Sequence, residues 1–159
     1  MDNKEKHQEN LELVQLVSFV LGKEIFGIEI LHVQEIIRLV SITKVPDAPQ
    51  FVEGVINLRG RVIPIVDLRV RLGIETSNHN NSTRIIVVEL NEMVVGFIVD
   101  EVNEVLRIPK TILEPPPPLV GSVDSEYITS VGKLENSLLI LIDLKNVLSF
   151  DEKKILAEV

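Results

Sequence analysis

The stretch Phe51–Leu68 reads FVEGVINLRGRVIPIVDL, and it carries the clearest structural signal in the chain. Val and Ile residues lie on both sides of the polar segment Asn57-Leu58-Arg59-Gly60, so we predict two strands joined by a tight corner. Asn and Gly suit such a corner, because Gly adopts a positive φ without steric cost. Arg59 would then stand out from a rigid β corner, where its planar donors favour recognition of a carboxylate over catalysis.

The composition favours a β protein and argues against several classes of function. Hydrophobic residues make up 45% of the chain but aromatic residues only 4%, so the core must be aliphatic, which favours strands. Cysteine is absent, which excludes disulfides, thiolate metal ligands and cysteine nucleophiles. The net charge of −8 argues against a nucleic-acid binder, which needs a basic patch.

The sequence lacks the usual signals for membrane insertion, secretion, metal binding and catalysis. No run approaches the ~20 apolar residues of a membrane span. The polar start MDNKEKHQEN has no apolar signal core, so we expect a cytoplasmic protein. His7, His32 and His79 are scattered without ligand spacing, and phosphate loops and nucleophile elbows are absent. We therefore expect no metal, no cofactor and no enzymatic activity.

The rest of the chain divides into short strands separated by turns and loops. In the first half we predict strands at 14–21, 25–28 and 35–39, with a short helical turn within 29–34. A short helix should begin at the cap Asp67 and end at Gly73, before an Asn-rich loop at 75–83. In the second half we predict strands at 84–90, 93–99, 127–131 and 138–142, an extended proline run at 115–118 and a terminal helix within 150–159.

An internal repeat relates the two halves. A shift of 69 residues aligns Gln15 with Arg84, and beyond the proline run a shift of 76 aligns Asp67 with Asp143. The aligned pairs include Gly27 with Gly96, Val33 with Val102, Glu35 with Glu104, and Val55 with Val131. The corner is not shared, because Lys133-Leu134-Glu135-Asn136 stands where the first half has Asn57–Gly60. Arg59 is therefore particular to one half.

The repeat predicts the domain organisation. One unit of roughly 60 residues buries little core alone, so two small barrels should pack together and form a third core between them. We expect a flexible tail at 1–13, one cooperative domain at 14–150, and a C-terminal tail or short helix at 151–159. The barrels would span about 14–80 and 81–150, and strand exchange between them is left open.

At this level of detail the sequence resembles the CheW-type chemotaxis coupling proteins. The resemblance covers about residues 14–150 and is carried by five stretches: Phe26–Ile30, Val33–Ile36, Phe51–Gly60, Pro64–Leu68 and Val95–Asp100. It implies a mainly β fold of two five-stranded SH3-like barrels with short helical segments. It also implies an adaptor that joins the regulatory domain of a CheA-type histidine kinase to the hairpin tip of methyl-accepting chemoreceptors.

The resemblance further implies recruitment to receptor arrays at the inner face of the membrane, without membrane insertion. Carried over residue by residue, it places the receptor site in a groove between the barrels. The implied site residues are Val33, Glu35, Gly54, Asn57, Leu58, Arg59, Gly60, Gly96 and Val102.

Each of these residues also has a simpler interpretation. Arg59 contacts an acidic group of a partner helix, or it pairs locally, with Glu53 as a candidate. Asn57 and Gly60 are turn formers that hold Arg59, and Glu35 is either a contact or a structural residue shared with Glu104. Val33 and Val102 belong to the core or line the groove as an apolar patch. Asp67 and Asp143 are expected to be helix caps and not a catalytic pair.

Three other functions compete with this interpretation. A scaffold for another receptor–kinase pathway, such as surface motility, would have the same features. A small hydrolase or ligand-binding barrel would need a pocket with converging polar groups. An oligonucleotide-binding barrel would need surface aromatics for stacking, and five Phe and one Tyr make it the weakest of the three.

Overall fold

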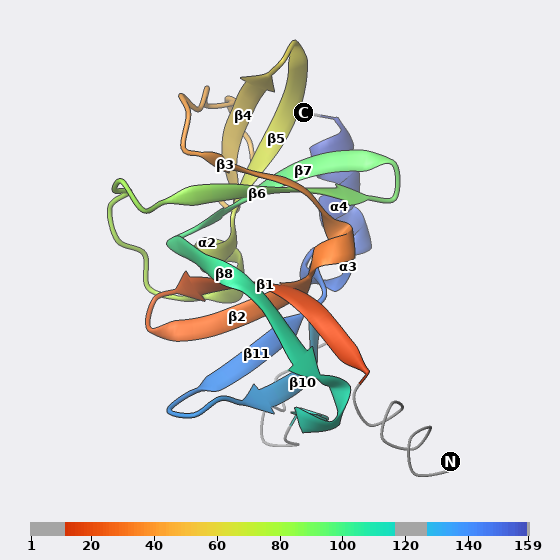
Figure 1. Cartoon of the computed structure of the whole chain (residues 1–159). Helices are drawn as coiled ribbons and strands as arrows, with labels where there is room; N and C mark the ends of the chain where they lie inside the picture. Colours follow the sequence, from red (N-terminus) through yellow and green to blue (C-terminus); the bar gives the residue numbers. More distant parts are fainter. Residues whose placement is uncertain (1–11, 117–126, 159) are drawn as a thin grey trace, which may run out of the picture.

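The computed structural model describes residues 12–116 and 127–158, and it is mainly β, as predicted. The strands are β1 (Leu13–Leu21), β2 (Glu24–Glu29), β3 (Val33–Arg38), β4 (Val52–Leu58), β5 (Arg61–Asp67), β6 (Arg84–Leu90), β7 (Met93–Val99), β8 (Glu101–Pro109), β9 (Leu113–Glu114), β10 (Ile128–Lys133) and β11 (Leu138–Ile142) (Figure 1). The helical segments are η1 (Ile30–His32), η2 (Lys110–Ile112), α2 (Leu68–Leu72), α3 (Leu144–Val147) and α4 (Phe150–Ala157). Residues 1–11 of the predicted tail and 117–118 of the predicted proline run lie outside the described residues, and β1 already begins at Leu13.

The elements around the predicted corner are confirmed. The hairpin β4–β5 contains the corner, and α2 follows it directly. The Asp67 side chain caps α2 by accepting from the Arg69 backbone N–H, and Gly73 ends the helix in the left-handed conformation. The Asp143 side chain caps α3 in the same way, so both aspartates are caps, as expected. None of the helices in the described part of the chain is long and apolar enough to span a membrane.

The strands form two sheets. In each sheet, the segment that follows one edge strand runs to the opposite edge and closes the sheet. The sheet orders are β8-β1-β2-β11-β10-β9 and β3-β6-β7-β5-β4. In the first sheet the edge strand β8 continues through η2 into β9, the opposite edge. In the second, the chain beyond β3 returns to β4 through two backbone hydrogen bonds of 2.9 Å between Thr43 and Val55. Closure satisfies the edges, and each sheet becomes a small barrel.

The strand exchange that the sequence left open is present. The hairpin β1–β2 belongs to the first repeat but lies in the sheet of β8–β11, whereas β6–β7 lies in the sheet of β3–β5. Two parallel pairs join the exchanged hairpins to their new sheets, β2 with β11 and β5 with β7. The repeat boundary near residue 80 therefore separates the two sequence copies, while each barrel takes strands from both.

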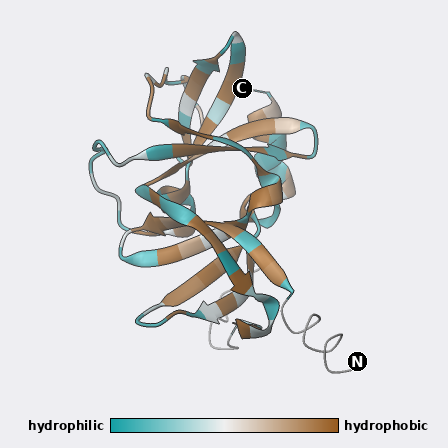
Figure 2. Ribbon diagram, in the orientation of Figure 1, coloured by the Kyte–Doolittle hydropathy of each residue, from teal (hydrophilic) through white to brown (hydrophobic). Residues whose placement is uncertain are grey.

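Three hydrophobic clusters fill this architecture, and the predicted third core is one of them. The largest lies between the barrels and includes Phe19 and Phe26 of one sheet with Ile86 and Phe97 of the other. One smaller cluster fills the β3–β7 barrel and another the β8–β11 barrel. Figure 2 shows hydrophobic residues along the strands of both barrels and hydrophilic ones at several turns. The exchanged hairpins therefore contribute to both a barrel interior and the shared core.

A substitution at Gly54 tests how the β3–β7 barrel is closed. A Cβ at Gly54 would lie 2.3 Å from the Thr43 carbonyl oxygen, against the bonds that join Thr43 to Val55. We expect Gly54→Ala to reduce the free energy of unfolding by about 3 kcal/mol. Gly27→Ala is the matched control, because its nearest contact would be 3.3 Å, to the Cδ1 of Leu139, and Gly27 has no positive φ. Equal losses in urea unfolding of the two variants would contradict this account of Gly54.

Candidate functional site

The corner is a tight hairpin turn with two left-handed residues. Arg59 has φ 51° and Gly60 has φ 84°, which is the signature of a type I′ turn between β4 and β5. The Asn57 side-chain oxygen accepts a hydrogen bond of 2.9 Å from the Gly60 backbone N–H. Asn57 and Gly60 therefore shape the turn, and Arg59 occupies the position that most favours Gly or Asn.

A left-handed arginine is a local strain, and it occurs in only one half. Residues other than Gly, Asn and Asp rarely adopt positive φ, and such positions concentrate at functional sites. Among the described residues, the equivalent segment Lys133–Asn136 contains no positive φ. The two corners thus differ in backbone as well as in sequence, and the fold by itself does not require this conformation.

The Arg59 guanidinium forms an ion pair with Glu35 on β3. The Arg59 Nη2 atom lies 2.6 Å from Glu35 Oε1, while the side chains are 71% and 29% exposed. Glu53, the candidate partner in the sequence analysis, is not the residue that pairs with Arg59. Its Oε1 atom lies instead 3.9 Å from His79 Nε2. An exposed pair of this kind contributes about 0–1 kcal/mol. Arg59 is therefore presented to solvent, and its carboxylate partner can be exchanged.

The repeat separates the role of Glu35 from that of Glu104. Within the described residues Glu104 makes no side-chain ion pair, although its backbone hydrogen-bonds to Ser18. The Glu35–Arg59 pair is therefore absent from the equivalent position of the other barrel. A structural role common to both halves does not account for Glu35.

Val33 and Val102 both face the space between the barrels. Val33 pairs with Val88 and Val102 with Phe19, and both are half-buried against the shared core. The sequence interpretation missed two neighbours, Ile36 and Val105, which are 37% and 51% exposed. They are repeat mates, and their strand partners Ile86 and Val17 also belong to the shared core. We call Val33, Ile36, Val102 and Val105 the outer stripe.

Two of the three glycines of the predicted site, Gly54 and Gly96, are buried. A Cβ at Gly96 would lie 2.6 Å from Ile65 Cδ1 and 2.7 Å from Ile85 Cγ2, inside the β3–β7 barrel. The Thr43 backbone leaves no room for a side chain at position 54. Leu58 is half-buried and packs against the hydrophobic cluster of the same barrel. Packing therefore accounts for Gly54, Gly96 and Leu58, and these residues are not part of the proposed receptor-binding surface.

A buried arginine that the sequence interpretation missed ties several segments together. The Arg69 side chain is 3% exposed and contacts both oxygens of Asp67, at 3.0 and 3.1 Å, and Asp100 at 2.9 Å. It also donates to the Ser77 carbonyl at 2.9 Å, which attaches the loop at 75–83. The hydrogen bond to Asp67 raises the pKa of Arg69 above its usual value, although burial opposes this.

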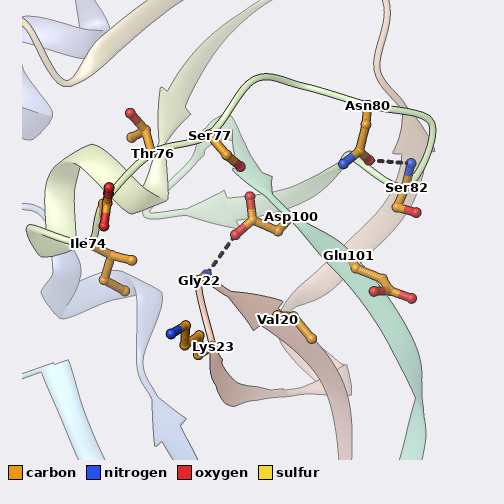
Figure 3. Close-up of a pocket in the computed structure, with 11 residues that line it drawn as sticks. Val20, Gly22, Lys23, Ile74, Thr76, Ser77, Asn80, Ser82, Asp100 and Glu101 are labelled. Atoms are coloured by element: carbon orange, nitrogen blue, oxygen red, sulfur yellow. Dashed lines mark hydrogen bonds between the residues drawn. The ribbon is translucent and has the colours of Figure 1, made fainter.

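Asp100 extends this network to the first hairpin. Its Oδ2 accepts a 2.7 Å hydrogen bond from the Gly22 backbone N–H in the β1–β2 turn (Figure 3). Together these contacts shape a cleft of about 720 Å³ between that turn and the loop at 75–83. Asp100 is thus engaged with the fold, and no group of three His, Asp or Glu residues suited to a metal lies in the described part of the chain.

Comparison with known proteins identifies the family. The model of the CheW-like domain matches residues 15–152. The chain belongs to the CheW-like domain family. It is 34% identical over 147 residues to the chemotaxis protein CheW of Helicobacter pylori, across 92% of this chain and 88% of that protein. It is 38% identical over 138 residues to the chemotaxis protein CheW of Klebsiella aerogenes, across 87% and 83%.

A solved structure agrees with the fold of this CheW-like domain. The scaffolding protein TtCheW from Thermoanaerobacter tengcongensis matches with a TM-score of 0.81 and 38% identity, over 89% of this chain and 96% of that one. The resemblance inferred from Phe26–Ile30, Phe51–Gly60 and Pro64–Leu68 is therefore confirmed, as is the fold of two SH3-like barrels.

The Arg69 network can be tested by removing its cation. Arg69→Met should lower the free energy of unfolding by about 3–5 kcal/mol, because it leaves Asp67 buried without its partner. Arg71→Met is the control, since Arg71 pairs with Glu152 at a half-exposed site, where the loss should be about 0–1 kcal/mol. Comparable urea midpoints for Arg69→Met and the native chain would show that the network does not stabilise the fold.

The strain at the corner can be isolated by comparing two variants that both lack the ion pair. Arg59→Gly should be about 1 kcal/mol more stable than Arg59→Ala, because alanine keeps the unfavourable positive φ. At Glu135, the repeat mate without a positive φ, the order should reverse. Thermal unfolding of the four variants measures both differences, and the same order at both positions would rule out a strained Arg59.

Proposed function

We propose that this CheW-like domain is a non-enzymatic adaptor that couples chemoreceptor tips to a CheA-type histidine kinase. The observation that carries the proposal is the strained, exposed Arg59, which is ion-paired to β3, the strand that also carries Val33 and Ile36 of the outer stripe. Family membership supplies the functional class, since the matched relatives are chemotaxis proteins and a scaffolding protein. Those names favour chemotaxis over a scaffold for another pathway such as surface motility.

The outer stripe and the corner suit a helical partner with apolar and acidic residues. Glu35 lies on β3 next to Ile36 in sequence but on the other face of the strand, so its ion pair joins Arg59 to the strand that carries Val33 and Ile36. A receptor hairpin would place apolar side chains against the stripe and a carboxylate on the Arg59 guanidinium. Because Arg59 already has a partner, the incoming carboxylate replaces one exposed pair with another. The contact therefore gains specificity and stays reversible.

Adaptor function requires a second surface for the kinase. We place kinase docking at a barrel end away from the corner, with apolar residues at strand ends as anchors. Two contacts on separate surfaces would let one chain hold receptor and kinase together at the cytoplasmic face of the membrane. Signal would pass as a change in the relative docking of the partners.

Co-sedimentation with a receptor hairpin fragment and a CheA-type kinase tests the proposal. The native chain should bridge the two proteins, and Arg59→Ala should weaken receptor binding at least tenfold, because the charge-assisted contact is lost. Kinase binding should remain, and the free energy of unfolding should change by no more than about 1 kcal/mol.

The matched control is Arg61→Ala, which removes the same charge from the next exposed position of the hairpin. Among the described residues Arg61 forms no ion pair, so its loss should leave receptor binding within about twofold. Receptor binding by Arg59→Ala at the native level, or unfolding of that variant, would remove the basis for Arg59 as the anchor.

A further inference from the structure

Two arginines lie directly opposite each other where β3 ends and β6 begins. Arg38 and Arg84 are paired in the antiparallel register of these strands, so their side chains project from the same face. Like charges at directly opposite positions destabilise a sheet. An anion bound between the two arginines would relieve this repulsion, and the chain as a whole, with a net charge of −8, offers many acidic residues that could have supplied one.

No such counter-ion comes from the described residues. Neither Arg38 nor Arg84 lies within ion-pair distance of a carboxylate in the part of the chain that the structure describes. Arg84 Nη1 donates to the carbonyls of Asn81 and Thr83, at 2.8 and 2.9 Å, which fixes its guanidinium. Its Nε and Nη2 donors stay without a described protein partner. The register thus places two cationic residues opposite each other, and neither has a carboxylate partner among the described residues.

The loop at 75–83 turns this pair into one wall of a cleft. The cleft has a volume of about 660 Å³ and is lined by Arg38, Leu39, His79, Asn80, Asn81, Thr83 and Arg84. The loop is held by its own hydrogen bonds. Asn80 Oδ1 accepts from the Ser82 N–H at 2.7 Å (Figure 3). The Asn80 N–H donates to Thr83 Oγ1 at 2.9 Å. Arg69 also attaches the loop to the barrel, because its Nη1 donates a hydrogen bond to the Ser77 carbonyl.

The other barrel provides an internal comparison. There the equivalent residues are Gln15 and Arg107, which also face each other in register. The unneutralised pair of arginines is therefore a feature of one barrel and not a requirement of the repeated fold. The one acidic contact of a described lining residue joins His79 Nε2 to Glu53 at 3.9 Å, on the loop side of the cleft.

We propose that this cleft binds a small phosphate-bearing molecule, with Arg38 and Arg84 sharing its dianion. The planar donors of two guanidinium groups match the oxygens of one phosphate, whereas a single carboxylate would neutralise only one of them. The side chains of Asn80 and Asn81 add neutral polar groups to the wall. The cleft volume of about 660 Å³ is in the range of small-molecule sites.

Titration with inorganic phosphate and pyrophosphate, followed by two-dimensional NMR and thermal unfolding, tests this site. Saturable shifts should appear at residues 38 and 79–84, and the unfolding midpoint should rise with ligand concentration. Sodium chloride at matched ionic strength should reproduce neither effect, since it supplies only screening. The principal variant is Arg38→Gln, because Arg38 makes no hydrogen bond or ion pair within the described residues.

We expect Arg38→Gln to weaken phosphate affinity at least tenfold while the unliganded unfolding midpoint is retained. Arg107→Gln, at the equivalent position of the other barrel, should bind within twofold of the native chain, as should Arg59→Ala. The absence of saturable shifts beyond matched salt, or equal losses in Arg38→Gln and Arg107→Gln, would overturn the proposal. Saturable binding of a Glu-rich peptide without a phosphate response would also overturn it, by assigning the pair to a protein partner.

Discussion

The parallel pairing of β2 with β11 and of β5 with β7 is the constraint on which the rest of the structure depends. It inserts the first hairpin of each repeat into the barrel of the other repeat. Neither barrel can then be completed by one half of the sequence. Along the exchanged strands, the side chains that do not face a barrel interior meet in the shared core between the barrels. Arg69 reinforces the junction, because the ends of β5 and β7 bring Asp67 and Asp100 to the same guanidinium.

This frame explains how one barrel can carry features that cost stability. The Asn57–Gly60 corner keeps a left-handed arginine, and the β3–β6 edge keeps two opposed arginines, although the other barrel avoids both. The opposed arginines cost up to about 1 kcal/mol and the left-handed arginine on the order of 1–3 kcal/mol, and a closed barrel joined to its neighbour by exchanged strands tolerates both. The asymmetry between otherwise repeated barrels therefore points to the surfaces where the chain meets other molecules.

Much of the site could be predicted because it depends on local chemistry. The corner, the caps at Asp67 and Asp143 and the one-sided occurrence of Arg59 follow from turn residues, capping residues and a comparison within the chain. The partner of Arg59 could not be predicted, since Glu35 and Glu53 are both acidic candidates in the sequence and only the closure of the barrel, which brings the β3 edge to the β4 edge, decides between them. The sequence interpretation assigned Gly54 and Gly96 to the receptor site, because the sequence does not show which backbone or side chain fills the space beside them.

The sequence by itself determined the strands, the corner, the two-barrel repeat and the family, because alternation, turn chemistry and internal alignment are local or linear properties. Only the tertiary structure decided the exchange of hairpins, the burial of Arg69, the exposure of Ile36 and Val105 and the meeting of Arg38 with Arg84. The physical reason is that pairing between distant strands depends on which closed arrangement buries the most apolar surface. Aliphatic strands of similar length present many equivalent edges, and their linear order does not distinguish among them.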